Sequence, residues 1–411
     1  MKVNKNFENI GLSATLEINE KSNKLISEGK TIYKFGLGQS PFPVPEIVVK
    51  ELINKSKEKD YLEVIGLKKL REVVAKYHSE KNNYKYLPEN IIVGPGTKEL
   101  LFQLQFILNY DLILPIPSWV SYGPQAKLLN KKIYYIKSSA EENWNINPLL
   151  LDECCANNPL AKLLIINSPN NPSGTRFNNY KKIGEVAKKY KLIVVSDEIY
   201  NELNYDGSYE SITNYYPEGT IVSSGLSKWC GAGGWRIGTM SFPNELKNIF
   251  DAFRVMASET FTSVSAPIQY AAIKAYSENH DKYLLNSRKI LKFISEFIYE
   301  EFSNVGIKCQ KAQGGFYMLC DFSETKISKF NDSRTLCKTI LEKTGFAMLP
   351  GTDFGFNENE LITRIAFVDF DGEKALNFLE SNVLDSKSLN KIFPNIDNGV
   401  RKLTNFIENF S

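Results

Sequence analysis

The sequence predicts an α/β fold built on a largely parallel β-sheet, and three observations lead to this prediction. Between about residues 90 and 240, short β-branched runs alternate with stretches of helical periodicity, as they do where helices connect parallel strands. The longest apolar runs, 163–166 and 192–195, have the length of strands that are covered on both faces. The chain of 411 residues also exceeds the roughly 250–300 residues at which a single core stops growing, so we expect a second domain.

Within the sheet region, strands and helices are expected in regular alternation. Apolar residues at helical spacing predict one helix from Thr97 to Leu108 and another from Asn179 to Tyr190. Apolar, β-branched runs bounded by turn residues predict strands at 91–93, 111–115, 132–137, 162–167, 192–196 and 220–224. Because helices separate these strands, we expect most neighbours in the sheet to run parallel.

Beyond the sheet region the pattern changes. Residues 245–295 are expected to be mainly helical. The later sequence predicts strands at 316–321 and 361–367, a helix at 336–344, and a closing helix whose apolar face holds Val400, Leu403, Phe406, Ile407 and Phe410. We therefore predict a large domain of residues 49–289 and a smaller domain of residues 1–48 and 290–411.

Composition and charge argue against several classes of function. The net charge of +3 is small, and basic residues are interspersed with acidic ones, so neither nucleic acid nor a membrane is expected as partner. The N-terminus lacks the apolar stretch of a secretory signal, which predicts a cytoplasmic location. None of the six cysteines is in a C-x-x-C arrangement, and free thiols are expected. The only two histidines, His78 and His280, are expected on helix surfaces and are too few for a multi-histidine metal site, so no metal is expected.

A lysine lies in a glycine-rich segment that also contains an arginine. Residues 227–238 have the sequence SKWCGAGGWRIG, in which Lys228 follows Ser227 and precedes Arg236 by eight residues. An amine among small residues is free to form an imine, and a planar guanidinium suits a phosphate. This combination is typical of a binding site for pyridoxal phosphate.

Several polar or glycine-rich segments directly follow predicted strands. They are 94–98, 117–119, 167–174, 197–200 and 223–228. In parallel sheets the ligand crevice lies beyond the carboxyl ends of the strands. We therefore expect the five segments to meet at one edge of the sheet.

In their order and spacing, these segments resemble the fold-type I pyridoxal-phosphate enzymes, specifically the class I/II aminotransferases. The resemblance extends from about Gly36 to Arg364. It implies a mainly parallel seven-stranded sheet in the large domain and a smaller α+β domain. It also implies pyridoxal 5'-phosphate as cofactor and transfer of an amino group between an L-amino acid and a 2-oxo acid by a ping-pong cycle.

The resemblance assigns the catalytic groups. Lys228 matches the lysine that forms an imine with the cofactor and then acts as general base at the substrate Cα. Asp197 matches the partner of the pyridine nitrogen, where a carboxylate keeps the nitrogen protonated. Tyr200 and Asn171 match the two residues that contact the phenolic oxygen of the cofactor.

The resemblance also assigns the phosphate-binding residues. The loop Gly96-Thr97-Lys98 joins a strand to a helix, whose N-terminal N–H groups suit a phosphate, and Ser227 and Arg236 complete this part of the site. One position departs from the pattern. Aspartate-type relatives often have a hydroxyl residue where this chain has Gly225, and whether Ser223 or Ser224 replaces that contact stays open.

The remaining assignments concern the substrate and the subunit interface. Arg364 matches the arginine that binds the substrate α-carboxylate, and Gly38 matches a glycine whose backbone approaches it. Trp119 matches the aromatic residue stacked on the cofactor ring, where it and Asn171 also border the substrate. Tyr61 matches a tyrosine that reaches the neighbouring subunit's phosphate, which implies a homodimer.

Two other functions are weighed against transamination. A carbon–sulfur β-lyase or related elimination enzyme uses the same scaffold, and the fate of the substrate carbanion depends on pocket geometry. A ligand-sensing regulator would need an added DNA-binding module, and only about 48 residues precede the large domain. The amino-acid specificity stays open, because no second cation can be assigned to a side-chain carboxylate.

Overall fold

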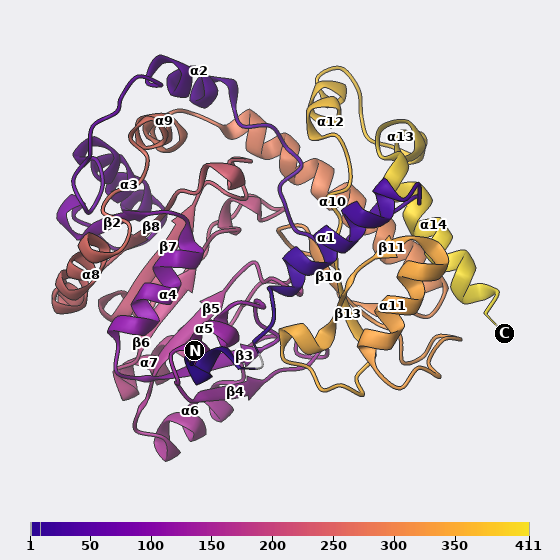
Figure 1. The fold of residues 1–411 in the computed structure, drawn as a ribbon, viewed down its shortest axis with the longest axis horizontal. Helices are drawn as coiled ribbons and strands as arrows, with labels where there is room; N and C mark the ends of the chain where they lie inside the picture. The colour runs from indigo at the N-terminus through magenta and orange to yellow at the C-terminus, as the bar shows by residue number, and fades with distance from the viewer. Residues whose placement is uncertain (1, 9, 411) are drawn as a thin grey trace.

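The structure, a computed structural model, describes residues 2–8 and 10–410. A seven-stranded sheet occupies one part of the molecule, and a smaller four-stranded sheet with its helices occupies the other (Figure 1). The large sheet has the strand order β2-β8-β7-β6-β5-β3-β4. Its strands are β2 (Ile91–Gly94), β3 (Asp111–Ile116), β4 (Ile133–Lys137), β5 (Ala161–Asn167), β6 (Ile193–Asp197), β7 (Thr220–Gly225) and β8 (Gly238–Ser241).

The large sheet confirms the predicted fold class. Six of its strands are those predicted from apolar runs, and β8 is the strand that the sequence analysis missed. Strand β8 runs antiparallel to both of its neighbours, β2 and β7, whereas the remaining neighbours are parallel. Its sequence, GTMS, lacks the apolar run that marks the other strands.

Helices cover both faces of the large sheet. They are α2 (Glu46–Asn54), α3 (Lys68–Lys81), α4 (Thr97–Ile107), α5 (Tyr122–Leu128), α6 (Pro148–Asn157), α7 (Tyr180–Tyr190), α8 (Lys247–Glu259) and α9 (Ala266–Ser277). Along β5, Ile165 packs into the core beneath α4 and α8, and its neighbour Leu164 packs into the core beneath α6 and α7. Because successive side chains of a strand point to opposite faces, this two-sided burial explains the continuous apolar runs.

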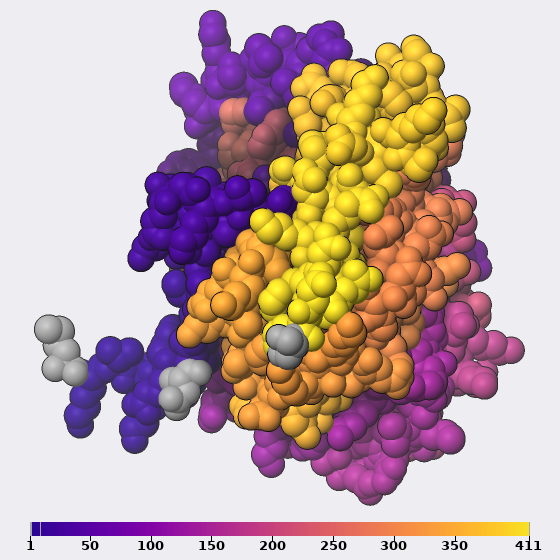
Figure 2. Space-filling model, turned by 90° about the vertical axis from the view of Figure 1, so that its right-hand side faces the viewer, coloured from indigo at the N-terminus to yellow at the C-terminus, as the bar shows by residue number. Residues whose placement is uncertain are grey.

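The second part of the molecule is built around an antiparallel sheet of order β12-β13-β10-β9. Its elements are α1 (Ala14–Ser27), β1 (Tyr33–Lys34), β9 (Lys308–Cys309), β10 (Tyr317–Asp321), α11 (Ser333–Thr344), β11 (Phe346–Ala347), β12 (Leu349–Pro350), β13 (Ile362–Ala366), α12 (Gly372–Leu379), α13 (Ser386–Ile392) and α14 (Pro394–Glu408). Figure 2 shows α14 lying across this part of the surface, in contact with α11 and the long helix α10 (Asp281–Asn304).

The predicted domain boundaries fall inside helices. The division at 48/49 lies within α2, and the division at 289/290 lies within α10. Helix α10 passes through the second division as one unbroken helix and contacts α12 and α14 (Figure 1). The division into two domains stays a prediction.

The expected surface position of His78 is wrong. On α3, His78 shares the buried face with Val74 and Arg71, at the spacing of successive helical turns. Its side chain is fully buried, and the loss of hydration lowers its pKa to about 3. Among the described residues, no helix is both long and apolar enough to cross a membrane.

Candidate active site

The structure places the five motif segments at the carboxyl edge of the large sheet. Asp197 is the last residue of β6, Asn171 follows β5, and Lys228 follows β7. Gly96 joins β2 to α4, and Trp119 follows β3. The antiparallel β8 also contributes to this edge through its first residue, because its direction is reversed.

Asp197 is a buried carboxylate with neutral hydrogen-bond donors. The Tyr122 hydroxyl donates to Oδ2 over 2.6 Å, and the Ile199 N–H donates to Oδ1 over 3.4 Å. Burial raises the pKa of Asp197 to about 6, although these donors and the charge of Lys228 act in the opposite direction. No ion pair joins Asp197 to a cation of the described chain, so a protonated pyridine nitrogen would be a favourable partner.

The amine of Lys228 lies between two parts of the molecule. Its Nζ donates to the carbonyl oxygen of Gly38 over 2.7 Å. The same atom lies 5.7 Å from the ring centroids of Tyr200 and Phe316. Lys228 therefore touches the glycine segment of the N-terminal region and the aromatic residues beside β10.

Arg236 and the start of α4 form an anion-binding corner. Gly96 has φ +93°, and a Cβ added there would lie 2.2 Å from Nη2 of Arg236. A Cβ at Gly238 would lie 2.6 Å from the backbone nitrogen of Thr97. Only glycines permit this approach, which brings a guanidinium against the free N–H groups of a helix N-terminus. Ser227, next to Lys228, lies in the turn against Gly233.

The departure at Gly225 has a steric explanation. A Cβ at Gly225 would lie 3.0 Å from the carbonyl oxygen of Ile237 and 3.2 Å from Cα of Gly238. A hydroxyl side chain at this position would crowd the beginning of β8. Ser223 is fully buried, with no hydrogen-bond partner for its Oγ among the described residues, and the choice between Ser223 and Ser224 stays open.

Trp119 and Lys98 border a cavity of about 800 Å³. Nζ of Lys98 lies 5.4 Å from the Trp119 ring centroid, within the range of a cation–π contact. Desolvation lowers the pKa of Lys98, and the charges of Arg236 and Lys228 lower it further. Three cations thus share one region, which favours an anionic ligand.

Arg364 is fully buried on β13. Its Nη1 donates to Oδ1 of Asn171 over 3.4 Å, and its Nη2 donates to the Gly36 carbonyl. Nε has no hydrogen-bond partner among the described residues. A buried guanidinium with an unused donor suits a planar carboxylate.

Tyr122 and Tyr317 are site residues that the sequence analysis missed. Tyr122 is the first residue of α5 and donates to Asp197. Tyr317 is the first residue of β10, and its hydroxyl lies 2.8 Å from that of Tyr200. The available signal for Tyr317 was its place in a predicted strand, 316–321, which in the structure pairs with the strand that carries Arg364.

Tyr61 does not join the other site residues within the chain. It lies between α2 and α3 with a side chain that is 89% exposed. That Tyr61 contacts the phosphate of a neighbouring subunit stays a prediction.

The arrangement fits pyridoxal phosphate. The corner at Gly96 and Arg236 suits a dianion, because it combines a guanidinium with a helix N-terminus. Asp197 is a buried acid that a cationic ring nitrogen would neutralise, and Lys228 supplies an amine near enough for its charge to lower the pKa of Asp197.

Comparisons with known proteins agree with this geometry. The profile of the family described as aminotransferase class I and II matches residues 30–380. An aspartate aminotransferase of Bacillus sp. (strain YM-2) is 33% identical over 356 residues, covering 84% of this chain and 89% of its own length. The aspartate aminotransferase of Bacillus subtilis (strain 168) is 30% identical over 382 residues, which cover 90% of this chain and 96% of its own length.

A solved structure of aspartate aminotransferase from Thermus thermophilus, crystallised with maleate, superimposes with a TM-score of 0.86 at 25% identity. The match covers 98% of this chain and 99% of that chain. The relatives and the structure are aminotransferases, which favours transamination over elimination. With a profile match across most of its length and the motifs converging at the sheet edge, this chain belongs to the class I and II aminotransferase family and is a pyridoxal-phosphate-dependent aminotransferase.

Proposed function

We propose that the enzyme is an aspartate aminotransferase, with L-aspartate as donor and a dicarboxylic 2-oxo acid as acceptor. The observation that carries this substrate class is a second cation beside the site. Arg364 is available to the α-carboxylate, and Lys98 faces the cavity beside Trp119, where a side-chain carboxylate would find a positive charge. The names of the similar Bacillus proteins support the choice.

Each catalytic group has a distinct role in this proposal. Bound pyridoxal phosphate supplies an electron-accepting ring that stabilises negative charge at the substrate Cα. Lys228 holds the cofactor and, once released, takes the proton from the substrate Cα. Asp197 keeps the ring nitrogen charged, and Tyr200 and Asn171 donate hydrogen bonds to the ring oxygen. Gly96, Thr97, Ser227 and Arg236 hold the phosphate, and Lys98, which the sequence analysis places with them, is assigned here to the substrate instead.

The position of the substrate follows from the carboxylate site. A bidentate contact with Arg364 orients the amino acid so that its Cα–H bond points toward the Lys228 amine. Trp119 covers the cofactor ring and excludes water from that face. The backbone of Gly38 approaches the same carboxylate.

Two measurements test the proposal. Borohydride reduction of the loaded enzyme, followed by peptide mass mapping, is expected to place the cofactor on Lys228, and attachment elsewhere would contradict the catalytic assignment. Incubation with L-aspartate alone is expected to yield one oxaloacetate per site, together with the amino form of the cofactor. If a monocarboxylic amino acid reacts with a higher kcat/KM than aspartate or glutamate, the proposed substrate class is wrong.

We also propose a cytoplasmic homodimer in which Tyr61 reaches the partner's phosphate site. Its exposure of 89% leaves the hydroxyl free for such a contact, and the six free thiols suit a reducing compartment. Mixing inactive Lys228→Ala subunits with impaired Tyr61→Phe subunits tests the interface. Each mixed dimer would contain one intact site, so activity is expected to rise on mixing, and no rise would contradict the shared site.

A further inference from the structure

We propose that Tyr317 is a positioning residue that joins the carboxylate-binding side of the active site to Tyr200. The inference rests on the proposed roles of Tyr200, Lys228 and Arg364. Tyr317 contacts the surroundings of all three, although it lies outside the motif segments.

The hydroxyl of Tyr317 lies at a junction of two contacts. It is 2.8 Å from the Tyr200 hydroxyl and 3.4 Å from the carbonyl oxygen of Gly38. That carbonyl also accepts the hydrogen bond from Nζ of Lys228, over 2.7 Å. One phenol therefore adjoins both the group proposed to contact the cofactor oxygen and the acceptor of the lysine amine.

The ring of Tyr317 supports Arg364. The guanidinium carbon lies 4.7 Å from the Tyr317 ring centroid and 5.1 Å from that of Phe354. Arg364 is fully buried, and no acidic residue of the described chain forms an ion pair with it within 4.0 Å. Aromatic faces are then its favourable electrostatic surroundings before a carboxylate binds.

Two glycines are required by the position of Tyr317. A Cβ at Gly38 would lie 1.9 Å from the Tyr317 hydroxyl oxygen. Gly174 has φ +72°, and a Cβ there would lie 2.2 Å from the Tyr317 carbonyl oxygen. Gly38 thus has a second reason to be glycine besides the approach of a substrate carboxylate, because the phenol occupies that space.

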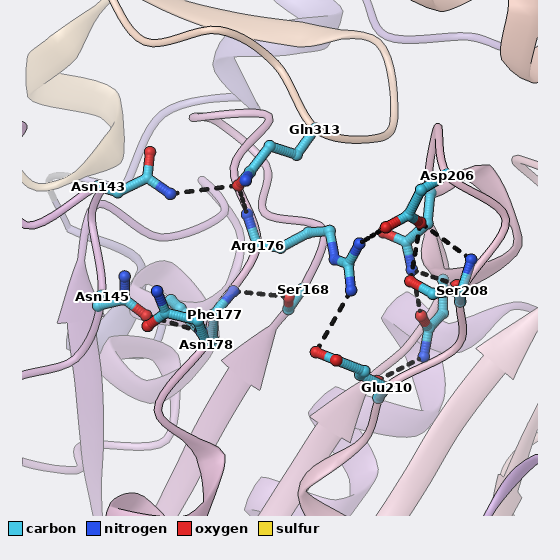
Figure 3. Close-up of polar contacts among 12 residues, drawn as sticks. Asn143, Asn145, Ser168, Arg176, Phe177, Asn178, Asp206, Ser208, Glu210 and Gln313 are labelled. Carbon is cyan, nitrogen blue, oxygen red and sulfur yellow. Dashed lines mark hydrogen bonds and ion pairs between the residues drawn. The ribbon is translucent and has the colours of Figure 1, made fainter.

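The segment before Tyr317 is held to the loop that follows β5. The backbone N–H groups of Gln313 and Gly314 both donate to the Gly174 carbonyl, over 2.8 and 3.2 Å. Oε1 of Gln313 accepts from the Arg176 N–H over 2.8 Å and from Nδ2 of Asn143 over 3.2 Å (Figure 3). These bonds limit the movement of the backbone that carries the phenol.

Tyr317 acts through the hydrogen bond between its hydroxyl and that of Tyr200. A hydroxyl has one hydrogen, so Tyr317 donates either to the Gly38 carbonyl or to Tyr200, and it donates to Tyr200 when the hydrogen of Tyr200 points to the cofactor oxygen. Burial raises the pKa of Tyr200 well above its ordinary value, so Tyr200 keeps that hydrogen. The hydrogen bond from Tyr317 to Tyr200 strengthens the hydrogen bond from Tyr200 to the cofactor oxygen, because hydrogen bonds in series polarise one another.

Tyr317→Phe tests the donor chain, because it removes the hydroxyl and keeps the ring. In the loaded enzyme, the pH midpoint of the cofactor's visible absorption change is expected to rise by a few tenths of a unit to about one unit. KM for the amino acid is expected to stay within about threefold, since the ring still faces Arg364. Tyr317→Leu removes the ring as well and is expected to raise KM by about tenfold or more.

Two controls separate this role from a general loss of packing. Tyr205→Phe removes a hydroxyl that donates to the Gly315 carbonyl over 3.0 Å, close to the same segment, and is expected to leave the midpoint unchanged. In a Tyr200→Phe background, Tyr317→Phe is expected to cause no further shift, because the two hydroxyls act in series.

The inference would be overturned if Tyr317→Phe left the pH midpoint of the cofactor's absorption change where it is in the wild type. It would also be overturned if Tyr317→Phe shifted that midpoint equally in the wild-type and the Tyr200→Phe protein. Borohydride mapping distinguishes this failure from that of the proposed function. Cofactor attached to Lys228 in both proteins, without a shift, rejects the role of Tyr317 alone. Cofactor attached elsewhere rejects the assignment of the site itself.

Discussion

The hydroxyl of Tyr122 donates a hydrogen bond to Oδ2 of Asp197 over 2.6 Å, inside a region that water does not reach. The phenol comes from the first residue of α5 and the carboxylate from the last residue of β6. A neutral donor lessens the cost of burying the carboxylate without removing it, and the pKa of Asp197 is still raised to about 6. The cofactor-free enzyme therefore contains a carboxylate that a bound cation would stabilise.

Asp197→Asn is expected to stabilise the cofactor-free protein above pH 6. The native pKa of about 6 exceeds the ordinary value of 3.8, so the native protein retains a proton that the unfolded chain loses as pH rises between these values. Wild-type stability consequently falls over this interval, by up to about 3 kcal/mol, and the amide avoids that loss. Denaturant unfolding at pH 8 and pH 4 measures the difference, which should be large at pH 8 and small at pH 4. An equal difference at both pH values would contradict the assignment.

Asp197→Asn has the opposite effect on the loaded enzyme. An amide leaves the ring nitrogen without a negative partner, so kcat is expected to fall by at least about 100-fold. Single-turnover kinetics with aspartate measure this loss. Asp206→Asn, which removes a carboxylate that is paired with Arg176 at the surface, serves as the control and should retain activity.

Arg364→Lys is expected to raise KM for aspartate by at least about 100-fold. A lysine cannot form the bidentate contact with a carboxylate or stack on Tyr317. Steady-state kinetics give KM, and spectroscopic titration gives the cofactor affinity, which should change little. Arg176→Lys provides a matched control, because Arg176 is also largely buried but pairs with Asp206 and Glu210 (Figure 3). A comparable rise in KM in that variant would point to general destabilisation.

Gly96→Ala is expected to weaken cofactor binding by at least about tenfold. The added methyl would meet Arg236, and φ of +93° disfavours any residue with a Cβ. Gly234→Ala is the control in the segment that carries Arg236, because a Cβ at Gly234 meets nothing within 4 Å. Equilibrium titration with pyridoxal phosphate should separate the two variants, and equal affinities would argue against a phosphate at this corner.

Lys98→Ala is expected to lower kcat/KM for aspartate by about 10-fold to 100-fold, because the side-chain carboxylate loses a partly desolvated cation. Alanine has no second carboxylate, so its kcat/KM should change by less than about threefold. Lys127→Ala removes an exposed lysine from the same cavity and is the matched control. Equal losses with aspartate and alanine would instead place Lys98 at the cofactor.

Much of the large sheet could be predicted because its signals are local. Runs such as that of β5 are apolar on both faces, and the turn after each strand contains glycine or polar residues. Strand β8 was missed because its sequence, GTMS, is short and only partly apolar. Backbone hydrogen bonds to β2 and β7 hold it in the sheet, and these bonds do not depend on a particular residue pattern.

Most of the site residues that could be predicted follow strands of the large sheet, whereas Arg364 and Gly38 were assigned only through the resemblance to the aminotransferase family. Tyr317 and Tyr122 have no motif of their own, and each meets its partner across a long stretch of chain, 117 positions from Tyr317 to Tyr200 and 75 from Tyr122 to Asp197. The burial of His78 could not be predicted for the same reason, because nothing in the neighbouring sequence shows that this polar residue lies on the inner face of α3.

The sequence by itself determined the alternation of strands and helices, and with it the loops that share one sheet edge, because periodicity and turn chemistry act over a few residues. Only the tertiary structure decided which side chains from other elements complete that edge. Tyr317 lies against Gly38, 279 positions away in the chain, and no local preference encodes a contact between a strand of the four-stranded sheet and a loop near the N-terminus.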